Sequence, residues 1–198
     1  MVKSYPGTVR IIGGRWRGKK LELPTECPLR PTPNRLRETL FNWLGPWIIG
    51  KRCLDLFSGS GALGIEALSR GASEVTLVEQ HQQTLAYLHR VKDQLKIEEK
   101  LLIKGMDVFQ FLQQDVAINY DLIFLDPPFS QSLLSQCGQL LVEKHWLSEN
   151  AKIYCEMECH LLEPNLPKHW QKLREQHIGN VKGLLLQNKQ QVATFPVT

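Results

Sequence analysis

The sequence predicts an α/β fold of the Rossmann-like kind, with a mostly parallel sheet and helices on both of its faces. From residue 51 onward, strand-like and helical segments alternate as in a βα repeat. Within this repeat, residues 53–64 form an apolar strand that runs into a Gly-rich turn and opens a helix. Such a turn places a ligand at the carboxyl edge of a parallel sheet.

The residues before the repeat are expected to form a β-hairpin extension. Strand-like pieces at residues 9–12 and 20–23 are joined by the basic, Gly-rich residues 13–18. A Pro-punctuated linker follows, so we divide the chain into a hairpin and linker at residues 1–33 and a main domain at residues 34–198.

Asn34 is predicted to cap a helix that runs to about residue 49. Its apolar residues recur at helical spacing, with Arg35 and Arg37 outside the apolar stripe. The repeat then predicts strands at 52–57, 74–79, 100–103 and 120–125, and helices near 62–71, 81–96, 107–114 and 131–144. Three further strands are expected at 152–157, 171–177 and 181–187. Gly179 and Asn180 suit a hairpin turn, so the final strand should enter the sheet antiparallel to the others.

Length and composition limit the classes of protein that this chain can belong to. With 198 residues, 42% of them hydrophobic, it can bury one full core but holds no second enzyme domain. Its apolar runs are too short to cross a bilayer and its first residues lack a signal-peptide stretch, so we expect a cytoplasmic protein without membrane contact. A monomer is the default expectation. Five cysteines without a Cys-x-x-Cys pair favour neither disulfides nor a metal site, and we interpret Cys155, Cys159 and His160 as structural.

Positive charge is concentrated at the start of the chain. Residues 1–52 hold eleven Lys and Arg against three Glu, a net charge of +8, whereas the remaining residues carry a net charge of −4. A solvated basic face is the ordinary explanation, but an aromatic residue among guanidinium groups also suits RNA, whose bases and phosphates are contacted together. The candidate RNA-binding residues are Arg10, Arg15, Trp16, Arg17, Lys19, Lys20, Arg35 and Arg37.

The Gly-rich turn has the pattern of a nucleotide-cofactor site. Gly59, Gly61 and Gly64 satisfy Gly-x-Gly-x-x-Gly, and Glu79 closes the next strand, where a carboxylate can accept both ribose hydroxyls. Alone, this pattern also fits NAD. Asp55 favours S-adenosylmethionine, because a carboxylate at this turn repels a pyrophosphate but attracts a sulfonium and an α-ammonium group.

Asp107 follows the third strand of the repeat, where it can reach an adenine amino group, with the N–H of Val108 as a donor to the ring. The candidate cofactor-binding residues are Asp55, Phe57, Ser58, Gly59, Ser60, Gly61, Glu79, Asp107 and Val108. A loop-capping role for Asp55 and a solvent-facing strand end for Glu79 are the structural alternatives. Acidic residues at the ends of several strands together favour a ligand site.

The residues Asp126-Pro127-Pro128-Phe129 follow an apolar strand and point to chemistry on an amino group of a base. Asp126 can accept one N–H bond, the Pro127 carbonyl can accept the other, and Phe129 can stack on the base. The same residues also make an ordinary turn that closes a buried strand.

Together these motifs resemble class I S-adenosylmethionine-dependent methyltransferases that act on amino groups of bases. Residues 10–18, 30–32, 35–43 and 55–64 resemble the RsmD family, bacterial guanine-N2 methyltransferases of small-subunit ribosomal RNA. The resemblance implies a seven-stranded methyltransferase fold and transfer of one methyl group to a single guanine of 16S ribosomal RNA in small-subunit assembly particles. It also implies that Arg30 and Thr32 border the methionine end of the cofactor, and that residues 15–20 hold RNA.

Three other functions remain open on the residues alone. An adenine-N6 methyltransferase acting on DNA or RNA uses the same tetrapeptide, since Asp-Pro-Pro-Phe serves either amino group. An NAD-dependent oxidoreductase fits the glycine pattern, and a non-catalytic RNA-binding or assembly protein fits the basic N-terminus.

Overall fold

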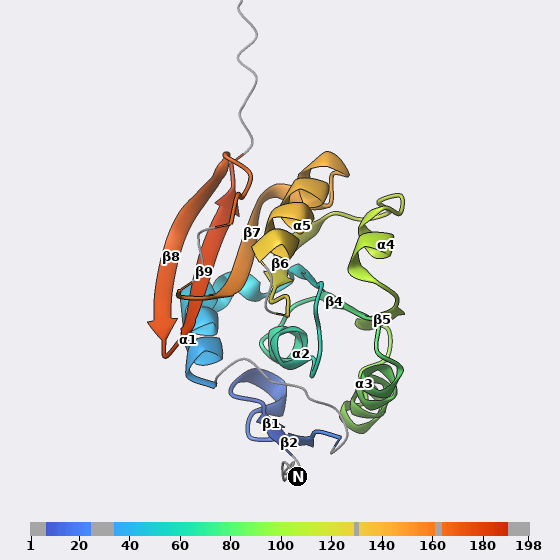
Figure 1. Cartoon of the computed structure of the whole chain (residues 1–198). Coiled ribbons are helices and arrows are strands. Elements are labelled where there is room, and N and C mark those ends of the chain that lie inside the picture. The colour runs from blue at the N-terminus through green and yellow to red at the C-terminus, as the bar shows by residue number, and fades with distance from the viewer. Residues whose placement is uncertain (1–6, 25–33, 129–130, 161–163, 190–198) are drawn as a thin grey trace, which may run out of the picture.

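The structure, a computed structural model, describes residues 7–24, 34–128, 131–160 and 164–189 (Figure 1). The N-terminal elements are β1 (Thr8–Arg10), a short 3₁₀ helix η1 (Gly14–Trp16), β2 (Lys20–Glu22), α1 (Asn34–Leu44) and a second 3₁₀ helix η2 (Gly45–Ile48). The βα repeat consists of β3 (Arg52–Asp55), α2 (Ala62–Ser69), β4 (Glu74–Glu79), α3 (Gln82–Leu95), β5 (Leu101–Gly105), α4 (Val108–Leu112), β6 (Tyr120–Leu125) and α5 (Gln131–Glu143). The described chain ends with β7 (Leu147–Glu158), β8 (Trp170–Ile178) and β9 (Val181–Asn188).

The main sheet has seven strands in the order β5-β4-β3-β6-β7-β9-β8. The pairs from β5 to β7 are parallel, whereas β9 is antiparallel to both β7 and β8. These findings confirm the predicted mostly parallel sheet and the antiparallel final strand. The strand order reverses between β3 and β6, and open α/β sheets bind their ligands at the carboxyl edge of such a reversal.

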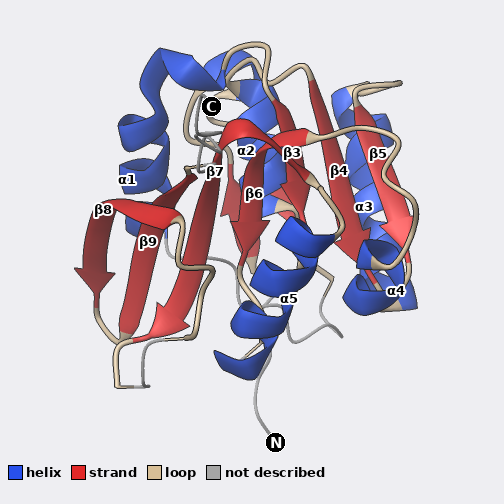
Figure 2. Cartoon of the chain, turned by 90° about the horizontal axis from the view of Figure 1, so that it is seen from above, coloured by secondary structure: helices blue, strands red, loops and turns tan. Residues whose placement is uncertain are grey.

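Helices cover both faces of the sheet, and each face has its own core (Figure 2). Successive strand residues point to opposite faces, so Leu122 and Phe124 of β6 pack with α1, α2 and α3, whereas Ile123 and Leu125 pack with α4 and α5. The first face is also covered by the N-terminal hairpin, since Val9 belongs to the same core.

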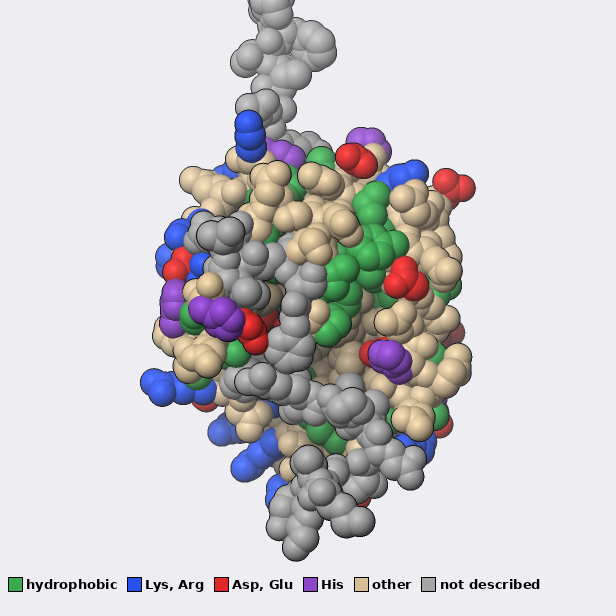
Figure 3. Space-filling view, in the orientation of Figure 1, with side chains coloured by type: hydrophobic (Ala, Val, Ile, Leu, Met, Phe, Trp, Pro, Cys, Tyr) green, Lys and Arg blue, Asp and Glu red, His purple; other side chains and the backbone are tan. Residues whose placement is uncertain are grey.

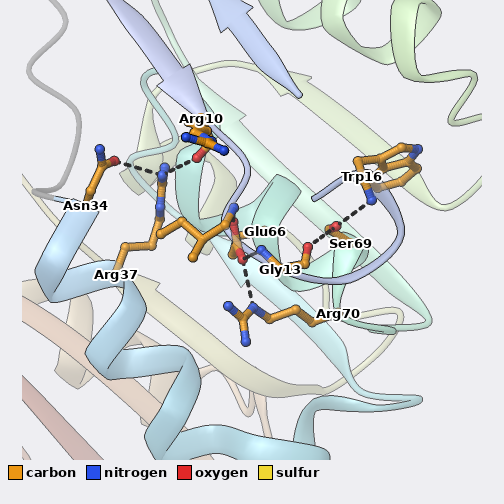
Figure 4. Close-up of polar contacts among 9 residues, drawn as sticks. Arg10, Gly13, Trp16, Asn34, Arg37, Glu66, Ser69 and Arg70 are labelled. Carbon is orange, nitrogen blue, oxygen red and sulfur yellow. Dashed lines mark hydrogen bonds and ion pairs between the residues drawn. The ribbon is translucent and has the colours of Figure 1, made fainter. Parts of the chain in front are cut away.

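The hairpin is fastened to α2 by a buried carboxylate. Glu66 is 1% exposed; one of its oxygens accepts the N–H of Ile12 at 2.8 Å, and the other accepts the N–H of Gly13 at 2.8 Å. Arg70 closes the group with an ion pair of 2.7 Å between its Nε and Glu66. Figure 4 shows Gly13, Glu66 and Arg70 side by side between the hairpin and α2. The division at residue 33 stays a prediction, but the hairpin shares core and hydrogen bonds with the main domain.

The next residues of the hairpin lie against the last turn of α2. The N–H of Trp16 donates to Ser69 Oγ at 3.0 Å (Figure 4). Gly14 has a φ of +75°, and a Cβ built there would lie 1.8 Å from the carbonyl oxygen of Ser69. Only glycine therefore fits this contact, which explains why a glycine stands at this position of the hairpin.

Two boundaries differ from the sequence prediction by five residues. The first helix ends at Leu44 instead of residue 49, because Gly45 has a φ of +50° and Pro46 starts a 3₁₀ turn. Strand β7 begins at Leu147 instead of residue 152, with the polar residues Ser148, Glu149 and Asn150 inside its span.

The prediction that Arg37 lies outside the apolar stripe of its helix is wrong. Arg37 is fully buried, and its Nη2 donates to the carbonyl oxygen of Arg10 and, at 2.9 Å, to Asn34 Oδ1 (Figure 4). The negative charge of Glu66 also interacts with the guanidinium of Arg37. The hairpin thus supplies a hydrogen-bond acceptor and α2 supplies a charge, and neither can be read from the helical pattern of α1 alone. Burial nevertheless lowers the pKa of Arg37.

Among the described residues, no helix is long and apolar enough to cross a membrane.

Replacing Glu66 by Ala removes the acceptor of two hairpin N–H groups and leaves Arg70 without its ion pair. We expect the free energy of unfolding to fall by about 3 kcal/mol, as for other buried donors and charges that lose a partner. Urea unfolding measures this loss, and amide hydrogen exchange should show faster exchange at Ile12 and Gly13. The exposed Glu98→Ala is the matched control; equal behaviour of the two variants would contradict the anchoring role.

Candidate functional site

Acidic residues from four neighbouring strands meet at the carboxyl edge of the sheet. Asp55 ends β3, Glu79 ends β4, Asp107 follows β5 and Asp126 follows β6. The strand order β5-β4-β3-β6 makes these strand ends neighbours in space. These acidic residues therefore lie together at the edge on which the sequence predicted a ligand site, and their contact with a ligand stays a prediction.

The Gly-rich turn is held open by backbone and side-chain hydrogen bonds. Both the N–H and the Oγ of Ser58 donate to the carbonyl oxygen of Val78, at 3.1 and 2.7 Å. Gly59 and Gly61 have φ values of +46° and +69°, which a residue with a side chain rarely adopts. The turn leads directly into α2, so the backbone can approach a ligand closely at the helix start.

Gly64 allows α2 to pack tightly on the sheet. A Cβ at this position would lie 2.5 Å from Leu77 Cδ2 and 2.9 Å from Val75 Cγ1. The N–H of Gly64 donates to Asp55 Oδ2 at 3.2 Å, so the packing of the helix also fixes the carboxylate. The hydrogen bond from the Gly64 N–H agrees with a loop-capping role for Asp55, the structural alternative given above. An N–H group carries no net charge, however, so it does not balance the charge of the carboxylate.

The environment of Asp55 disfavours its negative charge. Asp55 is 2% exposed, and its pKa is raised to about 7, chiefly by burial. The charges of Asp126 and Glu79 act in the same direction as burial, while the N–H groups of Gly64 and Phe57 act in the opposite direction. A cationic ligand at this edge is therefore stabilised electrostatically, whereas a pyrophosphate is repelled.

Glu79 is held rigidly at the end of β4. Its Oε1 accepts the N–H groups of Gln80 and His81 at 2.8 Å each, and its Oε2 accepts the N–H of Gly59 at 3.1 Å. At 8% exposed it is not a solvent-facing strand end, so that alternative does not hold. A carboxylate oriented in this way can accept hydrogen bonds from ribose hydroxyls.

Asp107 caps helix α4, because its Oδ1 accepts the N–H groups of Phe109 and Gln110 at 2.8 and 3.2 Å. Val108 is buried in the first turn of this helix. The cap explains why an aspartate stands there, and the contact of both residues with an adenine ring stays a prediction.

The tetrapeptide after β6 is described in part. Asp126 is half-buried, Pro127 is buried and Pro128 is exposed, while Phe129 lies outside the described residues. Arg30 and Thr32 also lie outside the described residues. Phe57 is half-buried and Ser60 is buried, both in or beside the Gly-rich turn.

Six of the eight candidate RNA-binding residues have exposed side chains: Arg10, Arg15, Arg17, Lys19, Lys20 and Arg35. Figure 3 shows Lys and Arg side chains gathered along the lower left of the molecule, on the side where Figure 1 places the hairpin and the start of α1. Five of the exposed candidates belong to the hairpin, and Arg35 lies at the start of α1. Their contact with RNA stays a prediction.

Two candidates do not fit direct RNA contact. Trp16 is 8% exposed and belongs to the core beneath the hairpin, so its ring is not presented to stack on a base. Arg15 lies over this ring, 5.5 Å from its centroid, and continues the packing outward. Arg37 is fully buried, as described above. The pattern of alternating Arg and Trp does not show which side chain points inward.

Sequence reasoning missed one residue at this edge, Glu156 of β7. The register pairs Leu125 of β6 with Cys155, so Glu156 lies beside Asp126. Glu156 is 5% exposed and accepts a hydrogen bond from the hydroxyl of Tyr154 at 3.1 Å. Within the apolar stretch at residues 153–157, Glu156 is the one carboxylate, and this was the signal that could have identified it.

The cysteines do not form a metal site in the described part of the chain. Cys155 is buried in the core, whereas Cys159 Sγ lies 3.4 Å from His177 Nδ1. His160 pairs instead with Glu158, at 3.2 Å. No group of three or more His, Cys, Asp and Glu residues among the described residues could hold a metal ion.

Comparisons with known proteins agree with this geometry. The chain is 42% identical to ribosomal RNA small subunit methyltransferase D of Escherichia coli K12 over 188 residues, which cover 95% of this chain and 94% of that protein. A solved Escherichia coli structure with a provisional methyltransferase description is 41% identical, with a TM-score of 0.86 over 93% of this chain and all of that chain.

A more distant structure shares the fold. An RNA methyltransferase from Salinibacter ruber in complex with S-adenosyl-L-homocysteine is 13% identical, with a TM-score of 0.63 over 84% of this chain and 98% of that chain. Residues 9–187 match the family described as Conserved hypothetical protein 95. The chain therefore belongs to this family, in agreement with the RsmD resemblance of its motifs.

Proposed function

We propose that this protein transfers a methyl group from S-adenosylmethionine to the N2 amino group of a guanine in 16S ribosomal RNA. The observation that carries the proposal is that Asp126 and Pro127 follow β6 directly beside the Gly-rich turn that follows β3. The family membership and the name of the Escherichia coli relative support this assignment. A base held by Asp126 and Pro127 would therefore face a cofactor held by the Gly-rich turn.

The residues present fit S-adenosylmethionine. Asp55, 2% exposed and close to two other carboxylates, favours a ligand with positive charge, and Glu79 offers a fixed acceptor for ribose hydroxyls. When bound, S-adenosylmethionine supplies an activated methyl group on its sulfonium. Asp55 would hold the cationic methionine end, and Asp107 and Val108 would border the adenine.

Orientation of the amino group is the main task of the protein in this reaction. The lone pair of an amine conjugated to a base ring is delocalised, so both N–H bonds must be held to aim the nitrogen. Asp126 accepts one N–H and the Pro127 carbonyl accepts the other, while buried Pro127 excludes water from the pocket wall. The nitrogen–carbon bond would form as the sulfur–carbon bond breaks, and the proton that N2 then loses would pass to solvent water. Because this proton becomes acidic only as the methyl group arrives, no strong general base is needed.

The exposed basic residues of the hairpin would bind the RNA around the target base. The hairpin is fixed to α2, the same helix that follows the cofactor turn. RNA held by the hairpin is therefore placed at a constant position relative to the methyl donor. We assign a monomer, because one chain supplies both the RNA surface and the catalytic edge. The proposed substrate is the small-subunit assembly particle in the cytoplasm.

The test of the proposed function is transfer of labelled methyl to small-subunit particles that lack their own modifications, followed by nucleoside mass analysis. We expect N2-methylguanosine at one position. In Asp126→Ala, turnover should fall roughly 100-fold or more, because the amine loses an oriented acceptor. Binding of S-adenosylmethionine, measured by calorimetry, should stay nearly unchanged. Asp115→Ala, on the exposed loop before β6, is the control for a lost carboxylate. N6-methyladenine as the product, or full turnover of Asp126→Ala, would overturn the assignment.

Affinity for S-adenosylmethionine should depend on pH through Asp55, whose pKa is raised to about 7. Below pH 7 the carboxyl is protonated and must lose its proton to pair with the cationic ligand. The Kd should therefore fall as the pH rises, by roughly tenfold per unit while Asp55 is mostly protonated. Calorimetry between about pH 5.5 and 7.5 measures the profile. Asp55→Asn keeps the acceptor for Gly64 and should flatten it; an equally steep profile in this variant would exclude Asp55 as the titrating group.

Neutralising Arg15 and Arg17 should weaken RNA binding without touching the catalytic edge. In the Arg15→Gln, Arg17→Gln double variant we expect a higher Kd for 16S ribosomal RNA. The slope of log Kd against log salt should become shallower by about one for each phosphate that the variant no longer neutralises. Lys100→Gln, an exposed residue directly before the edge strand β5, is the control and should bind as the wild type does. An unchanged salt slope in the double variant would place the RNA elsewhere.

A further inference from the structure

We propose that Glu156 is the residue that selects guanine, by accepting a hydrogen bond from N1–H of the base whose N2 amino group is held by Asp126. This inference rests on the proposed function, and it assigns the base specificity that Asp-Pro-Pro-Phe leaves open.

The position of Glu156 follows from the register of the sheet. Strand β7 runs parallel to β6, and Leu125 pairs with Cys155, so Asp126, the first residue after β6, lies beside Glu156, which is still within β7. Phe124 and Tyr154 both point to the face covered by α1 and α2. Because side chains alternate along a strand, Glu156 points to this face too. It thus lies on the same side of the sheet as Asp55, which contacts α2.

Glu156 and Asp126 both lie near the hydroxyl of Tyr154. Tyr154 donates its hydroxyl to Glu156 Oε1 at 3.1 Å, and the negative charges of Glu156 and Asp126 both raise the pKa of this phenol. Burial is the largest cause of the shift, so the phenol stays neutral and remains a donor. The two carboxylates are therefore close enough to share one electrostatic environment, as expected if both face one base.

The carboxylate of Glu156 is fixed before any substrate arrives. Opposite it on β9 stands Gly183, where a Cβ would lie 2.7 Å from the hydroxyl of Tyr154 and 2.8 Å from Leu36 Cδ1. The missing side chain leaves room for the phenol that orients Glu156. An acceptor held in this way binds a donor without a further loss of side-chain freedom.

Pairing with Arg37 is the structural alternative for Glu156. The charge of Glu156 does raise the pKa of Arg37, but Glu66 acts more strongly, and the hydrogen bonds of Arg37 go to Arg10 and Asn34. Arg37 therefore lies near Glu156 on the side of α1, whereas Asp126 follows the neighbouring strand. A carboxylate has two oxygens with about four acceptor directions, so Tyr154 and a base can share it.

The two candidate bases differ at the atom that Glu156 would meet. Next to its reactive amino group, guanine carries N1–H, a donor, whereas adenine carries an N1 lone pair. An ionised carboxylate accepts from the first and repels the second. Sites that hydrogen-bond a substrate N–H can reject an analogue without it by about 10⁴-fold, because the buried acceptor then stays unpaired. A second carboxylate beside Asp126 is thus a means of choosing guanine.

The experiment uses 2-aminopurine, which keeps the 2-amino group but has a lone pair in place of N1–H. The full-length protein is given RNA with either guanine or 2-aminopurine at the methylated position. We expect the wild type to prefer guanine by more than roughly 100-fold in kcat/KM. Glu156→Gln should lose at least roughly tenfold of kcat/KM on guanine and most of this preference, because its amide can donate to the N1 lone pair.

Glu158→Gln, the same change two residues further along β7, is the matched control and should keep the wild-type preference. Thermal unfolding and S-adenosylmethionine binding of all three proteins show whether a loss is structural. Equal preference in the wild type and in Glu156→Gln overturns the inference, as does a loss that only follows stability. Absence of methyl transfer to guanine by the wild type contradicts the proposed function instead, so the two failures are distinguishable.

Discussion

The site depends on carboxylates crowded at the point where the strand order reverses. Asp55 and Asp126 end adjacent parallel strands, and Asp55 is 2% exposed. Because the folded protein raises the pKa of Asp55 from 3.8 to about 7, the unfolded chain releases this proton first, and stability falls as the pH rises between these two values. A cation between the strands offsets this cost, while an anion adds to it. The glycine pattern, which fits several cofactors, is therefore restricted by charge to a cationic one.

Helix α2 connects the two ligands that a methyl transfer must bring together. Its first residues follow the Gly-rich turn, and Gly64 brings it against β4. Its last two turns carry Glu66 and Ser69, which bind the backbone of the hairpin. A helix of eight residues thus spans from the Gly-rich turn to the N-terminal hairpin. Because both contacts are made through buried hydrogen bonds, the hairpin behaves as part of the catalytic body.

The sequence predicted most strands and the acidic edge, because these depend on local patterns. Glu79 was recognisable from its distance to Gly59, and the structure joins the two by a hydrogen bond. What the sequence could not reveal depends on contacts between distant segments. Trp16 turns inward because Ser69 holds its backbone, and Arg37 is buried because Arg10 and Glu66 surround it. Aromatic and basic residues in a short motif look alike whether they face RNA or the core.

Glu156 could not be identified from a sequence motif. It lies thirty residues after Asp126 in the chain and has no motif around it, yet strand pairing places the two carboxylates side by side. The free energy lost by burying Glu156 is offset in part by the Tyr154 hydroxyl and the charge of Arg37. A core that needed only stability would be served as well by an apolar residue here. Within the proposed function, a buried carboxylate next to Asp126 also meets a donor that the substrate brings, the N1–H of guanine.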